Sequence, residues 1–194
     1  MMKRVFGLMA AIAVTMQAQA ADVYDIDASH THIGFSVRHM VVSSTKGAFN
    51  TFSGSFEVDG TDATTLKAMA KIDTKSIDTK NKDRDDHLRG ADFFDAEKFP
   101  EITFATTKVE KSGDGYILHG DLTMKGVTKA IALPIEVSGP VKNPWGKTVM
   151  GFEGTAKINR KDWGLSWNKV LDNGGVAVGD EVKLEISVEG IKRG

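Results

Sequence analysis

Apolar and polar residues alternate along most of the chain beyond residue 20. The clearest case is the segment 182–188, in which Val182, Leu184, Ile186 and Val188 alternate with Lys183, Glu185 and Ser187. Successive side chains of a strand point to opposite faces, so this period of two predicts half-buried strands. The pattern indicates eight of them, near residues 31–40, 47–58, 65–73, 101–110, 115–124, 129–138, 148–159 and 181–191.

A polar segment at residues 78–90 interrupts this alternation. Asp78 or Thr79 can cap a helix there, acidic residues fill its first turns, and Arg89 followed by Gly90 suits a helix C-terminus. The pattern therefore predicts one short surface helix between the third and fourth strands. The aromatic residues that follow are expected to pack this segment onto the end of the sheet, and the alternative is that they form a gate for a ligand: Phe93, Phe94 and Phe99.

Strands joined by short turns, with one helix among them, predict an all-β domain. Eight antiparallel strands can form a sandwich or an eight-stranded antiparallel β-barrel, and a barrel removes the exposed edges that a sandwich must protect. A barrel of this size is just wide enough to be filled by side chains or to hold one small ligand. No repeat, linker or block of like charge in the sequence marks a second domain.

The inward face predicted for these strands mixes bulky and small residues. The bulky members are Ile33, Phe35, Val37, Phe52, Phe56, Leu66, Ile72, Ile102, Phe104, Leu133, Ile135, Phe152, Val182, Leu184 and Ile186. The small members are Ala70 and Ala156, together with Gly54, Ala68, Gly120 and Gly154. Two interpretations stay open. Either the small residues leave an elongated apolar cavity, or phenylalanines of facing strands fill the gaps.

The first twenty residues have the pattern of a secretory signal. Two basic residues precede an apolar run at 5–16, and a small-residue cleavage signal ends between Ala20 and Ala21. The run is too short to span a bilayer, and the alternative is a helix that anchors the chain in the membrane. We expect residues 1–20 to be removed and residues 21–194 to form one domain in a bacterial periplasm.

Composition narrows the classes of function. Lys and Arg number 25 against 26 Asp and Glu, and removal of residues 1–20 would change the formal net charge from −1 to −3. Nucleic-acid binders usually carry a basic surplus on one face, so we expect no nucleic-acid partner. The chain has no Cys, which excludes disulfides, thiol catalysis and iron–sulfur clusters.

The histidines are the strongest candidates for chemistry. His30 and His32 would share one side of a strand, and His39, His87 and His119 complete the set. A metal site usually needs three or four convergent ligands with supporting carboxylates, and His32 and His39 have opposite strand parity. Motifs of serine hydrolases, zinc peptidases, P-loops and dinucleotide folds are absent from the sequence. We assign no catalytic residue and no metal ligand, and keep a metal-assisted hydrolase that uses the histidines as the alternative function.

Four stretches of the chain carry a resemblance to a known family. They begin at Tyr24-Asp25-Ile26-Asp27, at Arg84-Asp85-x-His87-Leu88-Arg89, at Gly120-Asp121-Leu122-Thr123-Met124-Lys125-Gly126 and at Arg160-x-Asp162-Trp163-Gly164-Leu165. In their order and spacing they resemble the YceI-like family of periplasmic polyisoprenoid-binding proteins. The resemblance covers essentially the whole chain after residue 20.

This resemblance implies a lipocalin-like barrel whose tunnel holds a long isoprenoid or another amphiphilic lipid non-covalently. It implies no established catalytic residue and no cofactor, with a bound isoprenoid lipid or quinone as the ligand. A membrane protein of the cytochrome b561 type is an implied partner, and an interaction module for such a redox partner is a further alternative function. Formation of a homodimer stays open. The headgroup of the lipid would lie at the open end of the tunnel, where the candidates for binding it are His30, His39, Arg84, His87 and Arg89.

Overall fold

Residues 20–40, 42–172 and 174–194 are described in a computed structural model of the chain. In this part of the chain, eleven strands form one antiparallel sheet. The elements are β1 (Asp22–Ile26), β2 (His32–His39), β3 (Ser43–Phe49), β4 (Phe52–Asp59), β5 (Asp62–Asp73), η1 (Thr74–Ser76), β6 (Ile77–Asp78), α1 (Lys82–Arg89), β7 (Glu101–Ser112), β8 (Gly115–Met124), β9 (Val127–Lys142), β10 (Thr148–Asn159), η2 (Arg160–Trp163) and β11 (Val178–Lys192).

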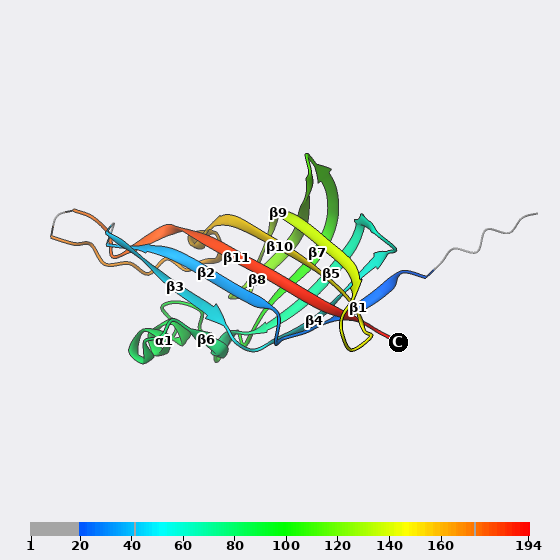
Figure 1. The fold of residues 1–194 in the computed structure, drawn as a ribbon. Coiled ribbons are helices and arrows are strands. Elements are labelled where there is room, and N and C mark those ends of the chain that lie inside the picture. The colour runs from blue at the N-terminus through cyan, green and yellow to red at the C-terminus, as the bar shows by residue number, and fades with distance from the viewer. Residues whose placement is uncertain (1–19, 41, 173) are drawn as a thin grey trace, which may run out of the picture.

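The sheet closes into a ring because β11 is long enough to pair with two strands on the same edge. Residues 178–187 of β11 pair with β2, whereas residues 190–192 pair with β1. The ring runs β1-β4-β5-β7-β8-β9-β10-β11 and returns to β1, while β2, β3 and β6 continue from β11 (Figure 1). The prediction of an antiparallel, lipocalin-like fold is confirmed, with eight of the eleven strands in the ring. The predicted strand at 47–58 is divided between β3 and β4, and β1 and β6 were not predicted, so the helix lies between the sixth and seventh strands rather than between the third and fourth.

Helix α1 is preceded by the two-residue strand β6, which is too short to show a period in the sequence. The helix begins after Asn81, whose side chain accepts a hydrogen bond from the Arg84 amide, so the predicted cap at Asp78 or Thr79 was wrong. Thr79 is buried instead, and its amide and hydroxyl donate to the Asp85 carboxylate at 2.9 and 2.5 Å. This contact ties the first turn of the helix to the end of β6.

The turn between β8 and β9 shows how local chemistry sets the pairing of the strands. Lys125 and Gly126 both have positive φ, 48° and 75°, as in the tight hairpin turns whose twist matches that of the strands. Gly126 also makes room for Phe99, because a Cβ at this position would lie 2.7 Å from the Phe99 ring. Lys125 and Gly126 therefore form a two-residue turn that joins β8 to β9, with Met124 paired to Val127.

Two groups of buried side chains fill much of the barrel. We call them the closed-end core, which includes Tyr24 of β1 where this strand completes the ring, and the mouth-end core, which lies against helix α1. The closed-end core includes Tyr24, Phe56, Val58, Leu66 and Leu118, each at most 1% exposed. The mouth-end core packs against Leu88 of α1 and includes Phe49, Ile77, Phe93, Trp163 and Leu165. The partly buried Phe104 contacts both cores. Helix α1 therefore marks the end of the barrel at which the mouth-end core lies (Figure 1).

Within the described residues, no helix is long and apolar enough to cross a membrane. The predicted signal segment 1–20 lies outside the described residues except for Ala20, which is exposed.

Candidate functional site

An apolar cavity of about 130 Å³ lies between the closed-end core and the mouth-end core. Its lining includes Leu118 and Phe152 from the first core and Leu122 and Met124 from the second. Eleven of the residues that alternation placed on inward faces line this interior cavity: Ile33, Phe35, Ala68, Ala70, Ile72, Ile102, Phe104, Leu133, Phe152, Leu184 and Ile186.

A second cavity, which we call the mouth pocket, lies beside helix α1 and has a volume of about 430 Å³. Its lining comes from β2, from α1 and from the segment that precedes β11. Three of the five candidates for headgroup binding line it: His39, Arg84 and His87. The structure therefore brings together an imidazole-rich and cationic pocket at the end of the barrel where the helix lies.

The other residues predicted to line a tunnel lie elsewhere. Phe56, Leu66 and Ile135 are buried in the closed-end core, and Val37 lines the mouth pocket. Phe52, Ala156 and Val182 line neither cavity. Alternation assigns a residue to a face of a strand, but it carries no information on the level along the barrel at which that residue packs.

Several residues of the interior lining were not predicted. Leu118, Leu122 and Met124 follow the alternation of β8, so a complete count along residues 115–124 would have found them. Ile26 and Phe49 are the last residues of β1 and β3. Alternation gives a weak signal at the last residue of a strand, because the pattern continues along the chain in only one direction from it.

The glycines on inward faces do not leave empty space. A Cβ at Gly120 would lie 2.2 Å from the ring of Phe104, so the phenylalanine occupies that gap. A Cβ at Gly154 would lie 2.3 Å from the Pro134 carbonyl oxygen, so two strands approach closely there. Both sequence interpretations hold in part: aromatic rings fill the gap at Gly120, while Ala70 lines the space that is left.

Phe35 of β2 is the residue that the linings of the two cavities share. Its ring lies over Gly47 of β3, where a Cβ would be 2.5 Å from Phe35 Cζ. The ring centroids of Phe35 and Phe49 are 5.9 Å apart. Phe35 therefore lies between the interior cavity and the mouth pocket.

Arg84 is held against the backbone that precedes α1. Its Nε donates to Thr79 Oγ1 at 2.7 Å, and its Nη2 donates to the Thr79 carbonyl oxygen at 2.8 Å. Nη1 makes no hydrogen bond to any residue that the structure describes. A guanidinium carries five N–H donors, so Arg84 is positioned by two of its nitrogens and retains donors for a ligand.

His87 lies at the border between the mouth pocket and the mouth-end core. Its ring meets Phe93 and Trp167 edge to face, with centroids 5.0 and 4.8 Å apart. Its Nε2 is 3.2 Å from Asp92 Oδ2. These contacts fix an imidazole between two aromatic rings, where it can hydrogen-bond a polar group that enters the pocket.

The remaining two candidates for headgroup binding, His30 and Arg89, do not line the mouth pocket. Arg89 donates from Nε to the Lys75 carbonyl and from Nη2 to the Ile77 carbonyl, each at 2.8 Å, and so fastens the helix to η1 and β6. His30 lies in the turn between β1 and β2, where its Nδ1 is 2.9 Å from Asp27 Oδ2.

His30 is grouped with carboxylates rather than with His32. Ligand atoms of Asp27, His30 and Glu189 lie within 4.8 Å of one another. Hydrogen bonds from Ser29 and then from His30 lower the pKa of Asp27 to about 2, and the hydrogen bond with Asp27 raises the pKa of His30. Among the described residues, this is the group of side chains that could hold a metal ion.

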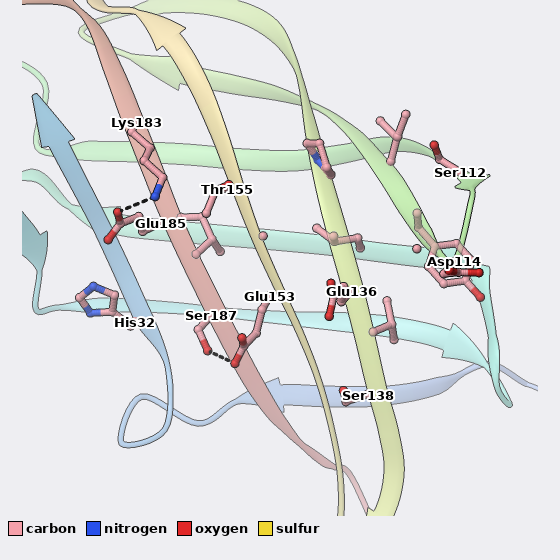
Figure 2. Close-up of a pocket in the computed structure, with 18 residues that line it drawn as sticks. His32, Ser112, Asp114, Glu136, Ser138, Glu153, Thr155, Lys183, Glu185 and Ser187 are labelled. Carbon is pink, nitrogen blue, oxygen red and sulfur yellow. Dashed lines mark hydrogen bonds and ion pairs between the residues drawn. The ribbon is translucent and has the colours of Figure 1, made fainter.

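His32 lines a different hollow, which lies on the outer face of β8 to β11 and measures about 1180 Å³ (Figure 2). The side chains labelled there are mostly polar or charged. Lys183 Nζ donates to Glu185 Oε1, and Ser187 Oγ donates to Glu153 Oε1, both at 3.0 Å. Because this hollow is open and charged side chains stand among its apolar ones, it shelters an apolar chain from water less well than the interior cavity does.

Comparison with known proteins places the chain in a family. A family model described as the YceI-like domain matches residues 24–190. The chain belongs to the YceI-like family. It is 40% identical over 189 residues to a UPF0312 protein of Vibrio vulnificus (strain YJ016), covering 96% of each chain. It is 41% identical over 167 residues to a UPF0312 protein of Staphylococcus aureus (strain MSSA476), covering 86% of this chain and 95% of the relative.

Solved structures share the fold of this YceI-like chain. BcnA of Burkholderia cenocepacia aligns with a TM-score of 0.74 and 26% identity over 85% of this chain and 99% of its own. The YCEI protein of Campylobacter jejuni aligns with a TM-score of 0.69 and 33% identity over 81% and 90%. A polyisoprenoid binding domain from Saccharophagus degradans aligns with a TM-score of 0.62 and 14% identity over 88% and 98%, which shows a common fold.

Proposed function

We propose that this protein is a periplasmic carrier that holds the chain of a polyisoprenoid or a similar amphiphilic lipid inside the barrel. The observation that carries the proposal is the apolar interior cavity, which Phe35 separates from a mouth pocket with cationic side chains. The polyisoprenoid-binding domain of Saccharophagus degradans, which has the same fold, supports it. The basic residues and apolar run at the N-terminus support export.

The dimensions of the interior cavity specify how a chain would enter. Its volume of about 130 Å³ is smaller than the roughly 300 to 1,000 Å³ of ordinary ligand pockets. A longer chain therefore requires Phe35 to rotate, so that the ligand continues into the mouth pocket. Each buried methylene gains about 0.8 kcal/mol, so a five-carbon prenyl unit contributes about 3 to 4 kcal/mol before ordering costs.

The headgroup of the lipid would occupy the mouth pocket. Arg84 Nη1 is a donor that the pocket offers to a phosphate or to a quinone carbonyl, and the lining also includes His39, His87 and Lys169. Hydrogen bonds from a charged guanidinium are roughly twice as strong as neutral ones. The apolar cavity would thus supply most of the affinity, and the mouth pocket would select the polar end.

Mass spectrometry of lipid extracted from natively purified protein tests the proposal. We expect a prenyl lipid in stoichiometric amount, and protein that takes up no prenyl lipid would contradict the proposal. Ala70→Phe should reduce uptake at least about tenfold, because the ring enters the interior cavity and removes the space for about one prenyl unit. Ala132→Phe is the matched control, because Ala132 is exposed on the outside of β9.

A metal-assisted hydrolase is the second candidate function, because Asp27, His30 and Glu189 form the group described above. Calorimetric titration with Zn²⁺, followed by an assay with an activated ester, tests it. The hydrolase requires stoichiometric Zn²⁺ binding and activity that His30→Ala abolishes. His32→Ala is the control, since His32 lies outside the group, and absence of Zn²⁺ binding would eliminate this candidate.

A further inference from the structure

Exposed apolar side chains gather at the end of the molecule that carries the mouth pocket. Met40 and Val42, in the turn between β2 and β3, are 43% and 81% exposed. Val170 and Val176, in the segment between η2 and β11, are 73% and 40% exposed. We call these four residues the mouth tip. Met40 belongs to the lining of the mouth pocket as well, so the mouth tip and the pocket are continuous.

Backbone hydrogen bonds hold the two parts of the mouth tip together. The Met40 amide donates to the Ala177 carbonyl at 3.0 Å, and the Ala177 amide donates to the Lys169 carbonyl at 2.9 Å. Val170 and Val176 are joined by an isolated antiparallel bridge. The mouth tip therefore extends the sheet, and its two segments reach the same end of the molecule, opposite the C-terminus (Figure 1).

The charged residues that line the mouth pocket are mainly cationic. They are Arg38, Arg84 and Lys169, against the single carboxylate of Asp83. An apolar tip next to a basic rim matches the surface of an anionic bilayer, in which acyl chains lie beneath negative headgroups.

We infer that the mouth tip inserts into the surface of an anionic lipid bilayer, with the mouth pocket turned toward the membrane. The inference rests on the proposed function in one respect only: docking on the bilayer would serve to load and release the carried lipid. A protein partner fits the mouth tip less well, because the hot spots of protein interfaces are enriched in Trp, Tyr and Arg, whereas the four tip residues are aliphatic or a thioether.

A second exposed apolar site lies at the other end of the barrel and provides the control. Trp145, in the loop between β9 and β10, is 80% exposed. Val149, which follows this loop, pairs with Ile191 near the end of β11, whereas His39 pairs with Val178 at its start. Trp is common at membrane interfaces, so Trp145 is the alternative point of contact with a bilayer. Docking through Trp145 would turn the mouth pocket away from the bilayer.

Co-sedimentation of the natively processed protein with vesicles tests the inference. With vesicles of phosphatidylglycerol and phosphatidylethanolamine, we expect binding that the double variant Val42→Ser, Val170→Ser weakens about tenfold or more. We expect Trp145→Ser to bind like the unmodified protein. Absence of binding, or loss of binding in Trp145→Ser but not in the double variant, would overturn the inference. Urea unfolding at an unchanged midpoint shows that each variant is folded.

Uptake of farnesol from solution, followed by tryptophan fluorescence, separates this inference from the proposed function. The double variant should take up dissolved farnesol normally and should lose only the transfer of prenyl lipid from vesicles. Vesicle binding without farnesol uptake would support docking and contradict the carrier function. Farnesol uptake without vesicle binding would support the carrier function and overturn docking.

Discussion

The closed-end core and the mouth-end core are formed by the same alternating strands, yet they pack to different degrees. At the closed end, Tyr24 stacks on Phe56 with ring centroids 5.0 Å apart, and Phe152 meets Phe56 edge-on at 5.6 Å. Gly190 makes this possible, because a Cβ there would lie 2.5 Å from the Phe56 ring. The interior cavity borders both cores, whereas the mouth pocket borders only the mouth-end core, through Leu88, Phe93 and Trp167.

The difference follows from how each end is closed. At the closed end, β1 pairs with both β4 and β11, so a continuous backbone ladder surrounds the core. Toward the mouth, β11 pairs with β2 instead, and side chains of α1 and of the segment before β11 line the opening. A closed ladder brings strands to a fixed spacing and allows dense packing, whereas a side-chain closure leaves space that a ligand can use.

Truncation of an aromatic ring at each end should give the largest effects and the clearest contrast. Phe56→Ala should lower the free energy of unfolding by about 3 to 5 kcal/mol, because the ring is buried on all sides. Phe35→Ala should cost clearly less, because cavities already border this ring, and it should speed prenyl uptake by opening the passage. Urea unfolding and uptake kinetics measure the two effects. Equal losses of stability would show that the two ends are packed alike.

Arg160 tests whether side chains replace the backbone ladder at the mouth end. Its Nε donates to the Gly179 carbonyl at 2.9 Å, its Nη1 donates to the Leu165 carbonyl, and burial lowers the pKa of this guanidinium. Arg160→Met should lower the free energy of unfolding by about 3 kcal/mol, since buried carbonyls lose their donors at about 1 to 3 kcal/mol each.

Lys161→Met is the control for Arg160. Both side chains donate to the Asp180 carboxylate, but Lys161 is exposed. It should change the free energy of unfolding by less than about 1 kcal/mol. Urea unfolding measures both variants. If Arg160→Met is as mild as Lys161→Met, then the mouth end does not depend on this buried cation.

The smallest effect is expected at the turn where β11 changes partner. The raised pKa of His30 means that its pairing with Asp27 stabilises the fold at low pH and that this contribution is lost as the pH rises through the raised value. Hydrogen bonds lower the pKa of Asp27 to about 2. The ionised Asp27 therefore stabilises the fold at pH values above the usual carboxyl range, and this stabilisation is lost only as the pH falls through about 2.

NMR titration of the His30 ring measures this coupling. Asp27→Asn should lower the pKa of His30, because the hydrogen bond to the carboxylate is its largest cause. Asp25→Asn removes a carboxylate that binds Arg193 instead, and it should leave the titration of His30 in place. The same titration in both variants would contradict the contact between Asp27 and His30.

Much of the candidate site could be read from local patterns, and the remainder could not. Phe35 and Ala70 were assigned to the interior by alternation, and both line the interior cavity. Phe56 has the same inward parity but lies at a level where packing is complete. Arg89 has the charge and the N–H donors that suit a headgroup ligand, yet it donates to the carbonyl oxygens of Lys75 and Ile77. Its partners are distant in sequence, so no local pattern could reveal them.

By itself, the sequence determined the all-β class, the inward and outward faces of most strands, the short helix and the family, because each depends on local periodicity or on motifs. Only the tertiary structure decided that β11 pairs with both β1 and β2, that Phe35 divides two cavities, and that His30 meets Asp27 and Glu189 rather than His32. The physical reason is that alternation specifies a face, whereas the register between distant strands specifies which side chains meet at one level of the barrel.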